Sequence, residues 1–280
     1  MKAALIDNGS LEPASQRNLR AVAAAIGRSA GIPMEAVSWK HSDRIPAADL
    51  DGVAAWTAGP WIRSQVAAGE RHFTFIPFFI SSQGAVGSAL RAEVEAVAGD
   101  LPDVTVQFTG SIADDSGDNA APLAEIVAAR VREVIAAEGL RSPAVIVVDH
   151  GGPSRASAGL RDAVAAGVRL RLGAAASRLA AASMETPEGP EFAFNRPLFA
   201  ELLESPGFAD GDVVIAPLFL SPGRHAGLGG DLSTIARAAA ARRPGLRCHF
   251  AELVGTHPLA VEILSRRLRT ALEGSTLFFK

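Results

Sequence analysis

The sequence predicts an α/β protein of two similar domains, each a parallel β-sheet with helices on both faces. The chain has 280 residues, enough for two domains of ordinary size. Hydrophobic residues make up 48% and charged residues 20%, a balance typical of a globular chain. The first half recurs in the second, and short apolar segments alternate with longer helix-forming ones. Such alternation is typical of parallel strands joined by helices.

The internal repeat sets the domain organisation. Residues 6–10 align with 148–152 at a shift of 142 (150 − 8), and the same shift relates 21–24 to 163–166. Residues 77–81 align with 217–221 at 140 (217 − 77), and 122–124 with 258–260 at 136 (258 − 122). A period this long indicates duplicated domains, since solenoid repeats are about 20–50 residues long. Gly and Pro in segment 139–143 mark the boundary, which predicts domains 1–141 and 142–280.

The first two elements of the second half have clear signatures. Residues 144–148 are a β-branched apolar run soon followed by a Gly pair, which favours a buried parallel strand. Residues 158–172 are rich in helix formers. Leu160, Val164 and Val168 are spaced four apart there, which places them on one face of a helix.

The later elements are expected in the same alternating order. Residues 179–184 are a weaker strand prediction. Residues 213–216 predict a buried strand, which we expect to continue through residues 218–220. The last helix is expected to have Thr256 as its N-cap and Pro258 in its first turn.

Three side chains that can bind metal follow strands of the second half. His150 ends the first strand segment, His225 lies just past segment 218–220, and Glu185 closes segment 179–184. Ligands of open α/β sheets bind beyond the carboxyl ends of the strands, so we expect the three to converge on one rim. Two imidazoles and a carboxylate leave coordination positions open, as in metal sites that perform chemistry.

The first half keeps the scaffold without these ligands. The repeat places Asn8 opposite His150 and Ala85 opposite His225 (225 − 140). We therefore predict a metal site in domain 142–280 and a degenerate one in domain 1–141. The alternative explanation for the missing ligands is neutral sequence drift at the tips of the loops.

Composition excludes several classes of function. The net charge is −3, with 27 basic against 30 acidic residues, so the chain has no polybasic character and no nucleic-acid partner is expected. Cys248 is the single cysteine, which excludes an intramolecular disulfide and a cysteine-ligated iron–sulfur cluster. Asp7 interrupts the first apolar run too early for a signal peptide, and no run approaches the roughly 18 apolar residues of a membrane span. We expect a soluble, cytoplasmic protein without a membrane partner.

Three segments together resemble the class II chelatases. These are Asp-His-Gly-Gly at 149–152, Pro-Leu-Phe-Leu-Ser-Pro-Gly-Arg-His at 217–225, and Gly-Thr-His-Pro at 255–258. The family comprises the sirohydrochlorin cobalt- and ferrochelatases of cobalamin and siroheme synthesis. The resemblance covers essentially the whole chain, because long members are two such halves in tandem. It implies two similar chelatase-like domains facing each other across a cleft.

The resemblance assigns the site residue by residue. The family's two metal-binding histidines fall on His150 and His225, and a carboxylate present in some members falls on Glu185 by a looser alignment. These three residues are the predicted metal ligands and catalytic residues. Gly152 replaces the usual Ser of the family's His-Gly-Ser, and segment 226–231 is unusually Gly-rich. The first departure would modify substrate contacts, and the second would mark a subfamily with a different tetrapyrrole or metal.

The implied activity is insertion of a divalent metal ion, Co2+ or Fe2+, into sirohydrochlorin or a related tetrapyrrole. The ion is a substrate, Ni2+ and Zn2+ suit the same ligands, and no organic cofactor is expected. The carboxylates of the substrate need local hydrogen-bond donors, for which Arg196 is a further candidate. A monomer and a homodimer both remain open. The predicted substrate-binding residues are Gly151, Gly152, Arg155, Arg224 and Gly227.

Three other functions are alternatives for this sequence. A metal or tetrapyrrole carrier without turnover would use the same ligands. A nucleotide-binding loop at residues 227–230 lacks both the GxGxxG spacing and a Walker ending. The histidine phosphatases have an Arg-His-Gly arrangement, which is not present at residues 149–151 of this chain. The last two rank low.

Overall fold

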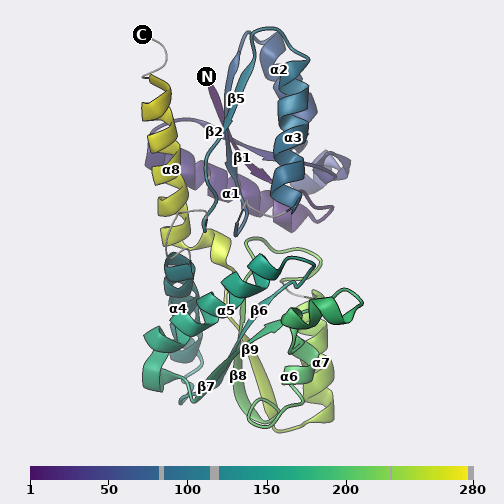
Figure 1. The fold of residues 1–280 in the computed structure, drawn as a ribbon, viewed down its shortest axis with the longest axis vertical. Coiled ribbons are helices and arrows are strands. Elements are labelled where there is room, and N and C mark those ends of the chain that lie inside the picture. The colour runs from purple at the N-terminus through teal and green to yellow at the C-terminus, as the bar shows by residue number, and fades with distance from the viewer. Residues whose placement is uncertain (82–84, 114–119, 228, 277–280) are drawn as a thin grey trace. The chain divides into compact units, whose positions relative to one another are not determined.

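The computed structural model describes residues 1–81, 85–113, 120–227 and 229–276. Contacts divide the chain into two compact units, each with its own parallel sheet (Figure 1). Unit 1 comprises Met1–Asp114 together with Pro258–Lys280, and unit 2 comprises Asp115–His257. No helix in the described ranges is both long enough and apolar enough to span a bilayer.

Unit 1 is a five-stranded parallel sheet of order β3-β2-β1-β4-β5, covered on both faces. Ile6 packs with Trp61 and Leu90 on the face covered by α2 and α3, whereas Leu5 faces the side of α1 and α8. The strands are β1 (Lys2–Asp7), β2 (Met34–Ser38), β3 (Trp56–Thr57), β4 (His72–Pro77) and β5 (Thr105–Phe108). The helices are α1 (Pro13–Ala30), η1 (Ser42–Arg44), η2 (Ala47–Leu50), α2 (Ala58–Ala67), α3 (Ala85–Gly99) and α8 (Pro258–Thr276).

Unit 2 is a four-stranded parallel sheet of order β7-β6-β8-β9. Ile146 and Ile215 pack with Leu232 on the face of α6 and α7, and α4 packs against α5 on the other face (Figure 1). The strands are β6 (Ala144–Asp149), β7 (Arg178–Ser183), β8 (Gly211–Pro217) and β9 (Leu246–Phe250). The helices are α4 (Ala120–Ala137), α5 (Arg155–Leu172), η3 (Gly173–Ala175), η4 (Pro190–Asn195), α6 (Phe199–Leu202), α7 (Asp231–Arg242) and η5 (Val254–Thr256).

The two sheets have the same topology once β3 is set aside. β1 lies between β2 and β4 as β6 lies between β7 and β8. Ile6 pairs with Pro77 and Val148 pairs with Pro217, so the aligned residues occupy equivalent register positions. The predicted fold class is confirmed.

The compact units do not coincide with the sequence halves 1–141 and 142–280. Helix α4 ends the first half yet belongs to unit 2, and α8 ends the second half yet belongs to unit 1. In unit 1, α8 packs against α1, and the Arg269 guanidinium donates to the Ser29 carbonyl at 3.0 Å. The segments 122–124 and 258–260, matched in the repeat, begin these two exchanged helices.

Two details of the predicted elements are wrong. β8 ends at Pro217, so residues 218–220 lie beyond the strand, where the chain turns into the loop that carries His225. Thr256 belongs to η5, and His257 separates it from the first residue of α8. The Thr256 hydroxyl instead accepts a hydrogen bond from Arg130 of α4 at 3.1 Å.

The carboxyl end of β1 holds an acidic side chain in a desolvated setting. Asp7 accepts hydrogen bonds from the Gly9 backbone N–H at 2.9 Å and from Ser38, both neutral partners. Burial outweighs these bonds and raises the pKa of Asp7 to about 6. The native state therefore holds this proton between pH 4 and pH 6, where the unfolded chain releases it.

We expect Asp7→Asn to become more stable relative to the wild type as the pH rises. The raised pKa costs stability fully above about pH 6 and not at all below the unfolded value, and a shift from 3.8 to about 6 corresponds to at most about 3 kcal/mol. Urea unfolding of both proteins at pH 4 and pH 7.5 measures the change. A variant-to-wild-type difference that is independent of pH would contradict the prediction.

Candidate functional site

The predicted site lies where unit 2 reverses its strand order. From the neighbouring strands β6 and β8, the chain continues outward to β7 on one side and to β9 on the other. Loops diverge at such a point and leave room for a ligand beyond the carboxyl ends of the strands. His150 directly follows β6, and His225 lies in the loop between β8 and α7.

The structure brings the three predicted ligands together. The His150 and His225 rings are in contact, with centroids 4.6 Å apart and planes at 81°. The Glu185 carboxylate follows β7 and lies 3.5 Å from His150 Nε2. The side chains of His150, His225 and Glu185 are 43%, 30% and 59% exposed, so a dissolved ion can reach all three.

Within the described part of the chain, no group of three or more His, Cys, Asp or Glu side chains is placed to hold a metal ion, and this includes His150, His225 and Glu185 as they stand. The site is therefore a histidine pair with an adjacent carboxylate, not a preformed closed shell. Closed four-ligand cages are typical of structural metals, whereas open sites suit ions that are exchanged or that react.

Hydrogen bonds fix which nitrogen of each ring is available. Nδ1 of His150 lies 2.8 Å from the Gly151 carbonyl, and Nδ1 of His225 lies 2.7 Å from the Asp231 carboxylate. Both oxygens are acceptors, so each Nδ1 donates its proton. In the neutral rings, each Nε2 then carries a free lone pair, which is the usual arrangement of a metal-binding histidine.

The backbone around His150 depends on a glycine. The Glu185 N–H donates to the His150 carbonyl at 3.0 Å, which joins the two loops beyond β6 and β7. Gly151 has a φ of +84°, and a Cβ there would lie 1.9 Å from the Glu185 carbonyl oxygen. The approach of His150 to Glu185 therefore requires Gly151.

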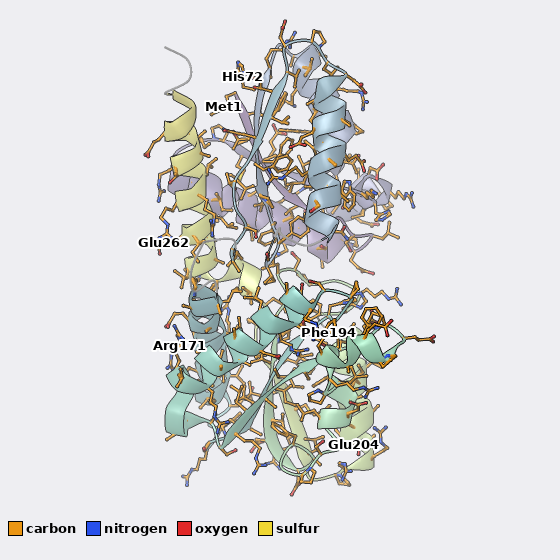
Figure 2. All side chains as sticks on the ribbon, in the orientation of Figure 1. Met1, His72, Arg171, Phe194, Glu204 and Glu262 are labelled. Carbon is orange, nitrogen blue, oxygen red and sulfur yellow. The ribbon has the colours of Figure 1, made fainter. Side chains whose placement is uncertain are left out.

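The predicted substrate-binding residues lie in the two loops that carry the histidines and at the first residue of α5. The Arg155 guanidinium lies 4.7 Å from the ring centroid of Phe194, which Figure 2 labels. Arg224 is 83% exposed, with Nε 3.8 Å from Asp231. Gly152 N–H donates to the Asn195 side chain at 3.3 Å. Gly227 has a φ of +116° and precedes Leu228, which lies outside the described residues.

Unit 1 has an equivalent rim with different side chains. The Lys40 N–H donates to the Asn8 carbonyl at 3.3 Å, as Glu185 does to His150. A cation thus replaces the carboxylate of unit 2, and an amide replaces its imidazole. The Lys40 ammonium lies 3.8 Å from the Trp39 ring centroid and 3.7 Å from Glu93. Helix α3 begins at Ala85, whose side chain is outside the described part.

Sequence reasoning missed the side chains that support the pair. Asp231 is the first residue of α7 and binds His225. From the sequence, the Gly-rich segment 226–231 is related only to the choice of substrate, and Asp231 has no assigned role. An acid opening a helix six residues after a histidine was the available signal. Arg161 and Asn195, both almost fully buried, gave no signal because such residues are mostly exposed.

Solved structures of known proteins share this fold. SirB from Bacillus subtilis with Fe3+ aligns over 100% of this chain and 99% of its own, with a TM-score of 0.64 and 16% identity. The sirohydrochlorin chelatase SirB from B. subtilis subspecies spizizenii in complex with cobalt aligns over 98% and 97%, with a TM-score of 0.62 and 14% identity. CbiX, the terminal enzyme of siroheme biosynthesis in denitrifying bacteria, aligns over 97% and 99%, with a TM-score of 0.60 and 18% identity.

These likenesses place the chain among α/β proteins with the two-unit chelatase fold. A search of curated sequences found no significant match. The CbiX family model matches residues 144–271, a stretch that contains the histidine pair. This match covers 128 of the 280 residues (271 − 144 + 1), and it shows that the second half of the chain is similar to the CbiX-type class II chelatases.

Proposed function

We propose that this chain inserts a divalent metal ion into a tetrapyrrole at the rim of unit 2. One observation carries the proposal: two imidazoles from separate loops are in contact, and both Nδ1 atoms are held by acceptors. Two Nε2 lone pairs are thereby left beside the Glu185 carboxylate. Borderline and hard ligands of this kind suit Co2+, Fe2+, Ni2+ and Zn2+.

The proposed chemistry needs groups that hold an ion and accept protons. Metal insertion replaces the two pyrrole N–H protons of the macrocycle with the ion, which sheds its water. His150 and His225 hold the ion through Nε2 and then take up the released protons. Glu185 captures the ion or assists proton removal. Asp231 holds the His225 ring and stabilises its cationic form after proton transfer.

Local donors are proposed to bind the carboxylates of the substrate. Arg155 and Arg224 supply guanidinium groups that can bind a carboxylate with two hydrogen bonds. The chain segment that follows Glu185 lines an open cavity of about 520 Å³, together with Phe192 and Arg196. Arg196 pairs with Glu201, so a carboxylate arm would have to compete with that pair.

Sirohydrochlorin is the proposed substrate, with Co2+ or Fe2+ as the inserted metal. The family match supports chelatase chemistry. Two structures with this fold were solved with Fe3+ and with cobalt, and one of them is a sirohydrochlorin chelatase by name. The product would serve cobalamin or siroheme synthesis.

Absorbance spectroscopy tests the function directly. The purified protein is mixed with sirohydrochlorin and either Co2+ or Fe2+, and the spectrum of the macrocycle is followed at catalytic protein concentration. Metallation of many equivalents of tetrapyrrole is the expected result. Binding of metal or macrocycle without turnover would instead favour a carrier.

A further inference from the structure

A buried arginine lies beneath the histidine pair. Arg161 of α5 is only 2% exposed, which is unusual for this residue type. Its Nη1 donates to the Ser183 hydroxyl and lies 3.7 Å from the Asp149 carboxylate. The Ser183 hydroxyl in turn donates to Asp149 at 2.6 Å. The residue before His150 is thus tied to Arg161.

The same guanidinium binds the segment that holds the other end of the His150 loop. Arg161 Nη2 donates to the Phe194 carbonyl at 3.0 Å, and Nη1 donates to the Asn195 carbonyl at 3.4 Å. The Asn195 side chain, 1% exposed, donates to the Gly152 carbonyl at 2.9 Å and accepts from the Gly152 N–H at 3.3 Å. Arg161 therefore connects to both neighbours of the His150–Gly151 turn.

Unit 1 fixes its equivalent loop without an arginine. Ser42 accepts from the Ser10 N–H and donates to the Ser10 carbonyl, both at 3.2 Å, as Asn195 binds Gly152. The Ser42 hydroxyl oxygen also lies 2.8 Å from the Ser38 hydroxyl oxygen, so the two side chains are in direct contact. In unit 2 the corresponding side chains, Ser183 and Asn195, are 12 residues apart (195 − 183) instead of 4. The guanidinium bridges that longer segment.

The internal repeat identifies which residue of unit 1 corresponds to Arg161. Helices α1 and α5 are both 18 residues long and begin 142 residues apart (155 − 13). Position 161 of α5 therefore corresponds to position 19 of α1 (161 − 142), which is a fully buried leucine. The half that lacks the histidines also lacks the arginine.

We propose that Arg161 is a positioning residue that holds His150 in place for metal binding, acting through Ser183 and Asp149 on one side and Asn195 on the other. Arg161 contacts neither His150 nor His225 itself. Its planar group of five donors matches several acceptors at fixed angles, which a lysine cannot do. Partners of this kind orient metal-binding histidines and affect metal affinity. The inference rests on the proposed metal site.

Cobalt binding without any tetrapyrrole tests the role of Arg161. Co2+ is titrated into the wild type and into Arg161→Leu, the residue present in unit 1, and the visible d–d absorption is recorded. We expect Arg161→Leu to weaken Co2+ binding about 10–100-fold and to alter the absorption band. Arg161→Lys should recover part of the affinity, because lysine restores the positive charge beside Asp149 but not the planar set of hydrogen-bond donors.

Two further variants separate positioning from folding. Arg171→Leu is the matched control: Arg171, labelled in Figure 2, is also on α5, where its Nε pairs with Glu125 at 2.8 Å, and its loss should leave Co2+ binding unchanged. Asn195→Ala removes the last link to Gly152, together with the bonds that the amide donates to Thr186 and to the Phe192 carbonyl, and should also weaken binding. If Arg161→Leu does not fold, Asn195→Ala decides the outcome.

The results distinguish this inference from the proposed function. If Arg161→Leu folds and binds Co2+ with wild-type affinity, the positioning role is overturned. If Arg161→Leu does not fold, wild-type Co2+ affinity in Asn195→Ala overturns it. If His150→Ala and His225→Ala lose Co2+ binding while Arg161→Leu keeps it, only this inference fails. If the histidine variants bind Co2+ as tightly as the wild type, the proposed metal site itself fails.

Discussion

Replacing His150 or His225 with alanine is expected to abolish metal insertion. Each substitution removes one of the two Nε2 lone pairs that the structure holds side by side. Loss of an orienting partner of a metal ligand typically costs about 10–100-fold in affinity or activity, so loss of a ligand should cost more. We expect a decrease of more than about 100-fold in the rate of Co2+ insertion, followed by absorbance of the macrocycle. Both rings are at the surface rim, so neither variant should lose its fold.

Asn8→Ala is the matched control for these variants. Asn8 occupies the position of His150 in unit 1 and makes the equivalent backbone contact with Lys40. This substitution should barely change the insertion rate. Comparable activity in Asn8→Ala, His150→Ala and His225→Ala would defeat the assignment of the site.

Gly151→Ala is expected to disrupt the site although it removes no side chain of a proposed metal ligand. The added Cβ would meet the Glu185 carbonyl oxygen at 1.9 Å, and the φ of +84° disfavours any side chain. A residue in such a conformation costs about 1–3 kcal/mol, and the clash adds to this. We expect the loops of His150 and Glu185 to move apart, with lower stability in urea and at least a tenfold loss of Co2+ affinity.

Gly9→Ala separates the two effects. Gly9 has a φ of +87°, and a Cβ there would lie 1.7 Å from the Lys40 carbonyl oxygen, so the strain is equivalent. This variant should lose similar stability, yet the folded protein should bind Co2+ as the wild type does. If Gly9→Ala and Gly151→Ala lose Co2+ affinity equally, the strain at Gly151 acts only by lowering the stability of the protein, and the predicted local effect on the site is contradicted.

Much of the fold follows from local patterns in the sequence. The run at residues 144–148 is apolar and β-branched because β6 is buried on both faces, and β6 indeed lies inside the sheet. The proximity of His150 to His225 followed from the rule for parallel sheets, since each follows a strand and β6 neighbours β8. The repeat then identified Asn8 as the counterpart of His150.

Other features could not be predicted because they depend on tertiary contacts. The shift of 142 places Asp43 opposite Glu185, whereas the structure places Lys40 there, because the loops after β2 and β7 differ. Arg161 reads in the sequence as one of many surface arginines, and only the convergence of Ser183, Asp149 and Asn195 reveals its buried position. An amphipathic pattern also does not specify which sheet a helix covers.

The exchange of α4 and α8 has a consequence for the duplicated chain. A cut at residue 141 would leave the first half with a helix that belongs to unit 2 and without the helix that packs on α1. Leu264 and Leu268 of α8, both fully buried in the intact protein, would be lost from the core of unit 1. The duplication therefore yields no independently excisable module. The polypeptide passes between the two folding units twice, and each sequence repeat supplies part of the hydrophobic core of the other.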